Sequence, residues 1–451
     1  MGCRVEFASR GGLYDFGVLP RSALRVPNDP NQWSTACFFG RQAMNVDRAR
    51  ELAGLLPGMT GDDFERDLLG SVRPDATPTK SDPARLPIVA VKAPIALARE
   101  RTAPRRMHAA QMRWWRSTVL AGNWTDSAVL LADSAARFCT AMRVHVRTRL
   151  ILNALRSRVT SIAERLGRND LVPALLAGYG GVIETALADD VWSLGRGKLE
   201  IGEFLMRHGF HGPNEGNVIG HSWREDPSAV LRAAGSHAAR SDDERPLLRA
   251  KRAVAARERA EKELLTGLSA VRRSLLRRLL RFAGVQVRSV ELTKAAFLTA
   301  IDGCRAAAST MGQDLAAAGI LARPDDTFYL TVDELTARCR PTCASWSTSA
   351  ALGARSTGIS RSPTCSPVCR PDPDGRRSQW RQQCGTRNTR WPRVFEGTVR
   401  VILDADSQDC LEDGEVLVCK FVDPGWTALV SLAGHSSPTS AAREPRCDRR
   451  A

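Results

Sequence analysis

The sequence has few aromatic residues and no long apolar run. Aromatic side chains make up 6% of the 451 residues, with only three tyrosines, whereas Ala, Leu and Arg are abundant. This composition favours helices over sheet across most of the chain. The longest mainly apolar stretch, residues 171–191, is interrupted by Pro173, by three glycines and by Glu184. It is too broken for a membrane span, so we expect no membrane partner.

The sequence also lacks a secretory signal and a disulfide framework. The start, MGCRVEFASRGG, has no apolar segment, and Glu6 stands where a myristoylation signal requires Ser or Thr. Twelve cysteines are too few in a chain of this length to form a disulfide scaffold. We therefore expect a cytoplasmic protein whose thiols are reduced.

The net charge of +16 raises the question of nucleic-acid binding, but its distribution argues against it. Residues 340–393 carry ten arginines and only two acidic residues, and residues 435–451 carry four arginines and two acidic residues. The rest of the chain is only mildly basic. We therefore expect no nucleic-acid partner.

Apolar residues recur every three or four positions through most of the chain up to residue 338, which is typical of helices. The pattern predicts helices over residues 108–120, 127–166, 171–194, 198–207, 242–283 and 292–321. Thr60 and Asp63 form a capping box ahead of another short helix.

The same pattern gives a domain organisation. Residues 1–70 begin as a loop-rich segment around GGLYD and then become helical. Residues 71–103 hold five prolines and little periodicity, which indicates a linker or insertion. Residues 104–338 form a helical domain. Residues 339–393 have no period of either kind and contain neither Glu nor Lys, so we expect them to be disordered or read out of frame.

Two alternating runs, Val399–Leu403 and Glu415–Cys419, flank a polar turn that contains Asp404 and Asp413. They predict two strands with a turn between them, within a segment of residues 394–434. Residues 435–451 form an aberrant tail.

The densest polar cluster follows a predicted helix end. Its candidate residues include Arg207, His208, His211 and Glu215, with Trp223 shortly after. Histidines and glutamates in a loop can bind a ligand or transfer protons. A loop that only caps helices explains the cluster as well.

Metal binding is disfavoured in two places. His208 and His211 lack a third ligand at a recognisable spacing. The Cys339/Cys343 and Cys365/Cys369 pairs repeat a CxxxC spacing that suggests zinc ligands, but they lie in the segment that has no periodic pattern. We therefore predict no metal site.

Two groups of motifs carry a family resemblance. FLMRHGFHGPNEGN followed by SWREDP, the residues 290–294, and the residues 325–335 resemble the central helical domain of rifampicin phosphotransferases and phosphoenolpyruvate-synthase-like enzymes. Phe38–Arg41 with Asn45 matches the same domain. The chain departs from the family at Phe210, where a histidine is usual, and at His211, where an arginine is usual, so the planar arginine fork that could hold an anion is absent there.

The second group lies near the end of the chain. GTVRVILD, LEDGEVLV and VDPGWT resemble the phosphohistidine (swivelling) domain of phosphoenolpyruvate-utilising enzymes. In that family a Gly-rich turn leads into a histidine that carries the phosphoryl group. Here His435 is followed by Ser436, Ser437 and Pro438 instead. The implied fold is mainly α, a helical central domain followed by an incomplete α/β phosphohistidine domain.

The resemblance also implies the site and its partners. The substrate-binding residues would be Arg207, His208, His211, Glu215, Trp223 and Lys294. No catalytic residue is expected, and no cofactor in this chain, because ATP and Mg²⁺ would be bound by other parts of an intact relative. The expected partners are a small-molecule acceptor and a separate ATP-grasp chain.

Back-translation gives a hypothesis of altered reading frame. Codons can be chosen for residues 444–450 so that reading one base later yields Ser-His-Ala-Ala-Ile-Val, the family's phosphohistidine motif. Residues 435–441, read two bases later, yield Phe-Val-Thr-Asp-Ile-Gly, the strand expected before it. Residues 341–351 can be recoded as a helical continuation. Genomic DNA without frame changes near 339, 393 and 434 would contradict the hypothesis.

We interpret the chain as a truncated, frame-disrupted, pseudogene-like remnant of an ATP- or phosphoenolpyruvate-dependent phosphotransferase, inactive alone. Two alternatives stay open. One is a non-enzymatic helical module that binds a ligand or a protein through residues 207–226. The other is a substrate-binding subunit complemented by a separate ATP-grasp chain.

Overall fold

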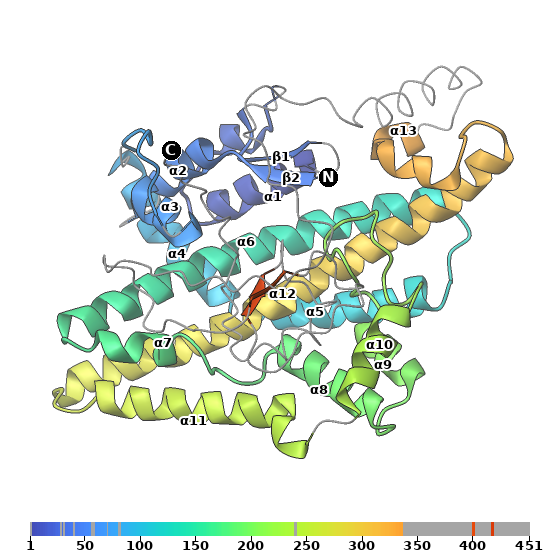
Figure 1. Ribbon diagram of the computed structural model, residues 1–451. Coiled ribbons are helices and arrows are strands. Elements are labelled where there is room, and N and C mark those ends of the chain that lie inside the picture. Colours follow the sequence, from blue (N-terminus) through green and yellow to red (C-terminus); the bar gives the residue numbers. More distant parts are fainter. Residues whose placement is uncertain are drawn as a thin grey trace, which may run out of the picture. The chain divides into compact units, whose positions relative to one another are not determined.

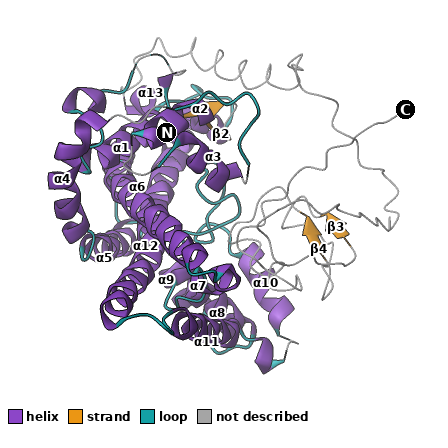
Figure 2. Cartoon of the chain, turned by 90° about the vertical axis from the view of Figure 1, so that its left-hand side faces the viewer, coloured by secondary structure: helices purple, strands orange, loops and turns teal. Residues whose placement is uncertain are grey.

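The computed structural model describes most of the chain up to residue 336 and two short segments beyond it. The described residues are 2–27, 29, 32–38, 41–55, 59–69, 71–79, 83–238, 241–336, 399–401 and 416–418. Within these ranges the chain is mainly helical, as the sequence predicts (Figure 2). None of the described helices has both the length and the apolar content needed to cross a membrane.

Several predictions concern residues outside the described ranges. They include the segment 339–393 with its cysteines, the polar turn at Asp404 and Asp413, the VDPGWT motif, and the tail from His435 onwards.

The chain divides into two compact units. The first consists of Met1–Thr185 and Ala250–Gly358, and the second of Ala186–Arg249 and Ile359–Ala451. The domain boundaries at residues 70, 103 and 338 stay predictions.

The first unit is built on two long helices, α6 (Ser127–Arg165) and α12 (Ala270–Ala317), which lie side by side (Figure 1). The carboxylate of Asp126 caps α6 by accepting hydrogen bonds from two backbone amides of its first turn, at 2.8 and 3.1 Å. Val159 and Ala163 of α6, one turn apart, share a buried apolar cluster with Leu276 and Leu280 of α12. Burying these facing stripes is the main stabilisation of the pair.

Shorter helices surround this pair. In chain order they are α1 (Gly2–Asp15), η1 (Arg21–Leu24), α2 (Val46–Gly54), α3 (Gly61–Leu69), η3 (Pro83–Arg85), α4 (Leu86–Arg99), α5 (Ala103–Trp114), the π-helix η4 (Trp115–Leu120), η5 (Asn169–Leu171), α7 (Val172–Leu175), η7 (Pro324–Tyr329) and α13 (Val332–Thr336). The capping box of α3 is confirmed, since Thr60 Oγ1 donates to Asp63 at 2.8 Å and accepts from the Asp63 amide at 3.1 Å. Helix α4 occupies part of the proline-rich stretch 71–103.

Two further helices, α8 (Ile183–Gly195) and α11 (Pro246–Leu264), each begin in one unit and end in the other. Helices α9 (Ile201–His208) and α10 (Ser228–His237) lie wholly in the second unit, and the short η6 (Asp242–Glu244) follows them.

Helix α1 corrects the prediction of a loop around GGLYD. It continues through Gly11 and Gly12 because these residues lie against α6. A Cβ atom at Gly12 would come within 2.8 Å of Val146 Cγ1, and one at Gly11 within 3.0 Å of Arg143 Cδ. The glycines therefore serve close helix packing here, not a turn.

Two predicted helices are wrong in their limits. The stretch 171–194 is divided into α7 and α8, because Gly178 has a φ of +64° and its backbone lies against Ala253, where a Cβ would meet the carbonyl oxygen at 2.2 Å. The stretch 242–283 is divided between α11 and α12 at a turn around Gly267, whose φ is +79°. Helix α12 then continues without the break predicted before residue 292.

The described strands form two separate pairs. Strands β1 (Thr35–Phe38) and β2 (Arg41–Met44) are antiparallel and were not predicted. Strands β3 (Val399–Val401) and β4 (Val416–Val418) lie where two strands were predicted, but they pair in parallel. The polar turn predicted between them falls on residues outside the described ranges. An α/β phosphohistidine domain around these strands stays a prediction.

Candidate functional site

The second unit has a small apolar core beneath a polar loop. Three helices and Trp223 supply the core, which comprises Leu187, Val191, Phe204, Trp223, Val230 and Ala234. Helix α9 ends at His208, and the chain then returns to α10 through residues 209–227. We refer to residues 207–226 as the histidine loop.

Backbone hydrogen bonds close the histidine loop on itself. The Trp223 amide donates to the His211 carbonyl at 2.7 Å, and the Arg224 amide donates to the Gly209 carbonyl at 2.8 Å. Gly212 allows this close approach, because a Cβ atom there would lie 2.4 Å from the His221 carbonyl oxygen. The two ends of the loop are thus held together, and His211 is fixed above the core.

Asp190, His208 and Arg207 form the first polar group of the site. His208 Nε2 lies 2.8 Å from Asp190 Oδ2, and Arg207 Nη1 donates to the same oxygen at 3.1 Å. Burial alone would raise the pKa of Asp190, but the hydrogen bonds from His208 and Arg207 outweigh it and hold that pKa below its usual range. Arg207 also pairs with Glu203. Its guanidinium is therefore already engaged by two carboxylates.

Burial has the opposite effect on His208. It lowers the pKa of the imidazole, and the hydrogen bond to Asp190 only partly opposes that change. The ring is 6% exposed. His208 is therefore neutral near pH 7 despite its carboxylate partner.

His211 and Glu215 form the second polar group. His211 Nδ1 lies 2.8 Å from Glu215 Oε1, and the two side chains are only 4% and 6% exposed. The residues are four apart in sequence, within the loop. The His211 pair is thus better sheltered from water than the His208 pair, in which Asp190 is 19% exposed.

Aromatic rings enclose the two imidazoles. The His208 and His211 ring centroids are 6.2 Å apart, and the Trp223 ring is 5.9 Å from that of His211. Phe204 lies 5.1 Å from His208, and Phe210 lies 4.3 Å from His211. The site thus consists of two neighbouring histidines packed between the rings of Phe204, Phe210 and Trp223.

The arrangement leaves a basic nitrogen on each imidazole. A carboxylate only accepts hydrogen bonds, so the nitrogen facing it carries the hydrogen and the opposite nitrogen of a neutral ring carries a lone pair. Those opposite nitrogens are His208 Nδ1 and His211 Nε2. Within the described part of the chain both are buried without a hydrogen-bond partner, as are Ser222 Oγ and Trp223 Nε1. Native proteins rarely leave buried polar atoms without a partner, so a water molecule or a polar ligand is expected to meet them.

The structure brings five of the six predicted site residues into one unit. Arg207, His208, His211, Glu215 and Trp223 belong to the second unit. Lys294 belongs to α12 of the first unit, where its ammonium pairs with Glu184 at 3.0 Å.

Sequence reasoning missed Asp190. It lies on α8, 18 positions before His208, in a run of two aspartates. The other, Asp189, pairs with Arg245 at 2.7 Å. Only the packing of α8 against α9 in the apolar core places Asp190 beside the histidine loop. Among the described residues, no three His, Cys, Asp or Glu side chains converge as a metal site.

Residues 197–291 match the rifampicin phosphotransferase fourth domain. The matched segment contains the whole histidine loop, α9, α10, α11 and the first part of α12. It relates this part of the chain to the phosphoenolpyruvate-utilising enzymes and confirms the resemblance there. No curated protein matches the chain.

Proposed function

We propose that the chain supplies the acceptor-binding part of a phosphotransferase related to the rifampicin phosphotransferases. The observation that carries the proposal is the pair of carboxylate-bound histidines, each with a buried basic nitrogen that has no described partner. Both lie in the segment that matches the family.

The two imidazoles suit an acceptor that carries a hydroxyl group. His208 Nδ1 or His211 Nε2 can accept a hydrogen bond from that hydroxyl and hold its proton when the oxygen is phosphorylated. The Trp223 and Phe204 rings offer an apolar surface beside it. Asp190 and Glu215 orient the rings and stabilise a positive charge on them.

The proposal assigns the phosphoryl donor to another site. The sequence holds no glycine-rich ATP cradle, and His435 lacks the glycine-rich turn of the family's phosphohistidine. ATP, bound together with Mg²⁺ to a separate chain, would supply the phosphoryl group. We further propose that the chain derives from a frame-disrupted gene and that it is cytoplasmic.

Binding of rifampicin and of a panel of hydroxyl-bearing compounds tests the acceptor role. We expect a thermal shift with at least one of them, and an affinity that falls about tenfold or more in His208→Phe and His211→Phe, since each removes one buried acceptor and keeps an aromatic ring. His221→Phe is the matched control, because His221 belongs to the same loop but its side chain is 66% exposed. Binding that is equally sensitive to all three substitutions contradicts the proposal.

A labelling experiment distinguishes the acceptor-binding part of a phosphotransferase from a module that only binds the compound. ATP labelled at the β-phosphate should leave the purified chain unlabelled, and an added ATP-grasp chain should allow phosphorylation of the acceptor. A chain that binds the compound but never supports its phosphorylation is a binding module instead.

A further inference from the structure

A cleft of about 780 Å³ lies in the first unit, between α11, the first half of α12 and the loop that holds Tyr179. Its size is that of a small-molecule site. It belongs to a different unit from the histidine loop, so its role does not depend on the proposed function.

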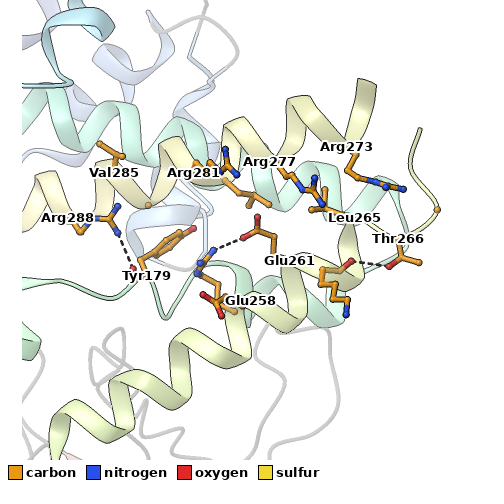
Figure 3. A pocket seen from close by; sticks show the side chains of 15 residues that line it. Tyr179, Glu258, Glu261, Leu265, Thr266, Arg273, Arg277, Arg281, Val285 and Arg288 are labelled. Atoms are coloured by element: carbon orange, nitrogen blue, oxygen red, sulfur yellow. Dashed lines mark hydrogen bonds and ion pairs between the residues drawn. The ribbon is translucent and has the colours of Figure 1, made fainter. Parts of the chain in front are cut away.

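The cleft is lined mainly by cations. Two acidic side chains, Glu258 and Glu261, line it together with six basic ones, which leaves a net charge of +4. The basic residues are Arg257, Lys262, Arg273, Arg277, Arg281 and Arg288. Figure 3 shows Arg277, Arg281 and Arg288 in a row along α12, on the side that faces α11.

Three members of this set are held in place. Arg257 donates to Glu261 at 2.8 Å and to the Gly178 carbonyl at 3.2 Å, and it lies over the Tyr179 ring. Arg288 donates to the Tyr179 carbonyl at 3.1 Å. Arg273 donates to the Leu268 carbonyl at 3.0 Å. These bonds to neutral carbonyls fix the guanidinium groups without neutralising Arg273 or Arg288.

Arg277 and Arg281 have no hydrogen-bond or ion-pair partner in the described part of the chain, although Glu258 and Glu261 line the same cleft. Arg273, Arg277 and Arg281 are spaced four residues apart. Like charges at this spacing destabilise a helix. Three in a row are an unfavourable arrangement that an anion in the cleft would relieve.

Gly284 shapes the wall of the cleft. A Cβ atom there would lie 3.1 Å from Tyr179 Cδ1, so the glycine lets the tyrosine ring lie close to α12. Burial lowers the pKa of Arg288, and the nearby Arg105 and Arg257 lower it further. The local potential is therefore positive even after the internal pairs are formed.

We propose that this cleft binds a small molecule with two or more phosphate groups. One phosphate monoester carries about −1.5 to −2 charges near neutral pH, so a net charge of +4 matches about two such groups. Arg277 and Arg281 are separated by about 6 Å along the helix and can each grip phosphate oxygens with a planar fork. A nucleic acid is the less favoured occupant, because Glu258 and Glu261 lie in the lining and would repel an extended phosphate backbone.

Calorimetric titration of the full chain with inorganic tripolyphosphate at low salt tests the proposal. Arg277→Gln/Arg281→Gln should weaken binding about tenfold or more, because two charge-assisted contacts are lost. Arg272→Gln/Arg278→Gln is the matched control: it removes the same charge from exposed positions of the same helix that do not line the cleft, and it should change affinity less than about twofold. Arg277→Lys/Arg281→Lys should give an intermediate loss, since it keeps the charge but not the fork, and it serves also if the glutamine variant fails to fold.

If the two glutamine double variants weaken tripolyphosphate binding equally, the anion is attracted by the overall positive charge and not by a specific site, and the proposal is overturned. The absence of tripolyphosphate binding to the wild-type chain would also overturn it. Tighter binding of a single-stranded oligonucleotide than of tripolyphosphate, with the same dependence on Arg277 and Arg281, would replace the small molecule by a nucleic acid.

Discussion

Asp190 Oδ2 and His208 Nε2 are 2.8 Å apart, which fixes the hydrogen of the His208 ring on Nε2. Glu215 meets His211 through Nδ1 instead. The two neighbouring imidazoles therefore present opposite nitrogens as bases. One loop thus offers two proton acceptors of different geometry.

This arrangement predicts opposite tautomers for the two rings at neutral pH. Long-range ¹H–¹⁵N spectra of the histidine side chains should show His208 protonated on Nε2 and His211 on Nδ1. Replacing Glu215 by Ala removes the acceptor at Nδ1, so the His211 signal should lose its Nδ1-protonated character while the His208 signal stays unchanged. The same tautomer for both rings in the wild-type chain would show that the carboxylates do not set it.

The buried His145 predicts a loss of stability in acid. Burial, and then the nearby Arg149 and Lys294, lower its pKa to about 3. Because the unfolded chain binds a proton at about pH 6.5 and the folded chain does not, the free energy of unfolding falls as pH drops below about 6.5 and until about pH 3. This one residue accounts for about 1.4 kcal/mol per pH unit over that window.

The variant His145→Asn isolates this contribution. Asparagine can still reach Thr293, which lies 2.9 Å from His145 Nδ1, but it does not titrate. Between pH 6.5 and 4.5 the variant should lose less unfolding free energy than the wild-type chain in urea titrations. Parallel pH profiles for the two proteins would rule out His145 as the source. His108, whose pKa burial lowers to about 4, acts in the same direction in both and cancels in the comparison.

Two glycines of the second unit should respond oppositely to alanine. A Cβ atom at Gly195 would lie 2.0 Å from the Ala234 carbonyl oxygen, whereas one at Gly235 meets nothing within 4 Å. Gly195→Ala should therefore destabilise the unit by about 1 to 3 kcal/mol through overpacking. Gly235→Ala, inside α10, should stabilise it by about 0.5 to 1 kcal/mol. Thermal unfolding that gives both variants the same sign contradicts the close contact of α8 and α10.

The hydrogen bond between Trp115 and Asp302 should contribute to the stability of the first unit. Trp115 Nε1 donates to Asp302 Oδ2 at 2.7 Å, and the two residues are 0% and 3% exposed. Trp115→Phe leaves the buried carboxylate without that donor, at a cost of about 1 to 3 kcal/mol. Trp124→Phe, at a half-exposed position, should change stability by less than about 0.5 kcal/mol. Equal unfolding midpoints for both variants would show that this hydrogen bond does not contribute to stability.

The sequence predicted helices well where apolar spacing was uninterrupted. Residues 127–166 hold such a pattern, and α6 ends within a residue of it. The sequence failed at glycines, because one residue type serves two opposite purposes. Gly12 lies inside a helix and allows close packing, whereas Gly267, with its positive φ, turns the chain between α11 and α12. Only the distant contact, or its absence, distinguishes them.

The candidate site was predictable to a similar degree. Local spacing indicated His208, His211 and Glu215, since all lie within one loop. Asp190 and the cationic cleft were not predictable, because they depend on how α8 meets α9 and how α11 meets α12. A pattern within one segment contains no information about the segment that packs on it.

The division of the first unit along the sequence has a consequence during synthesis. Helix α6 leaves the ribosome before residues 186–249, and α12 follows only after them. Helices α9 and α10 and the histidine loop contact residues close in sequence and can fold at once, while the apolar stripe of α6 waits in water for its partner. The nascent chain is therefore most exposed to aggregation and to chaperone binding after residues 186–249 have been made and before α12 follows.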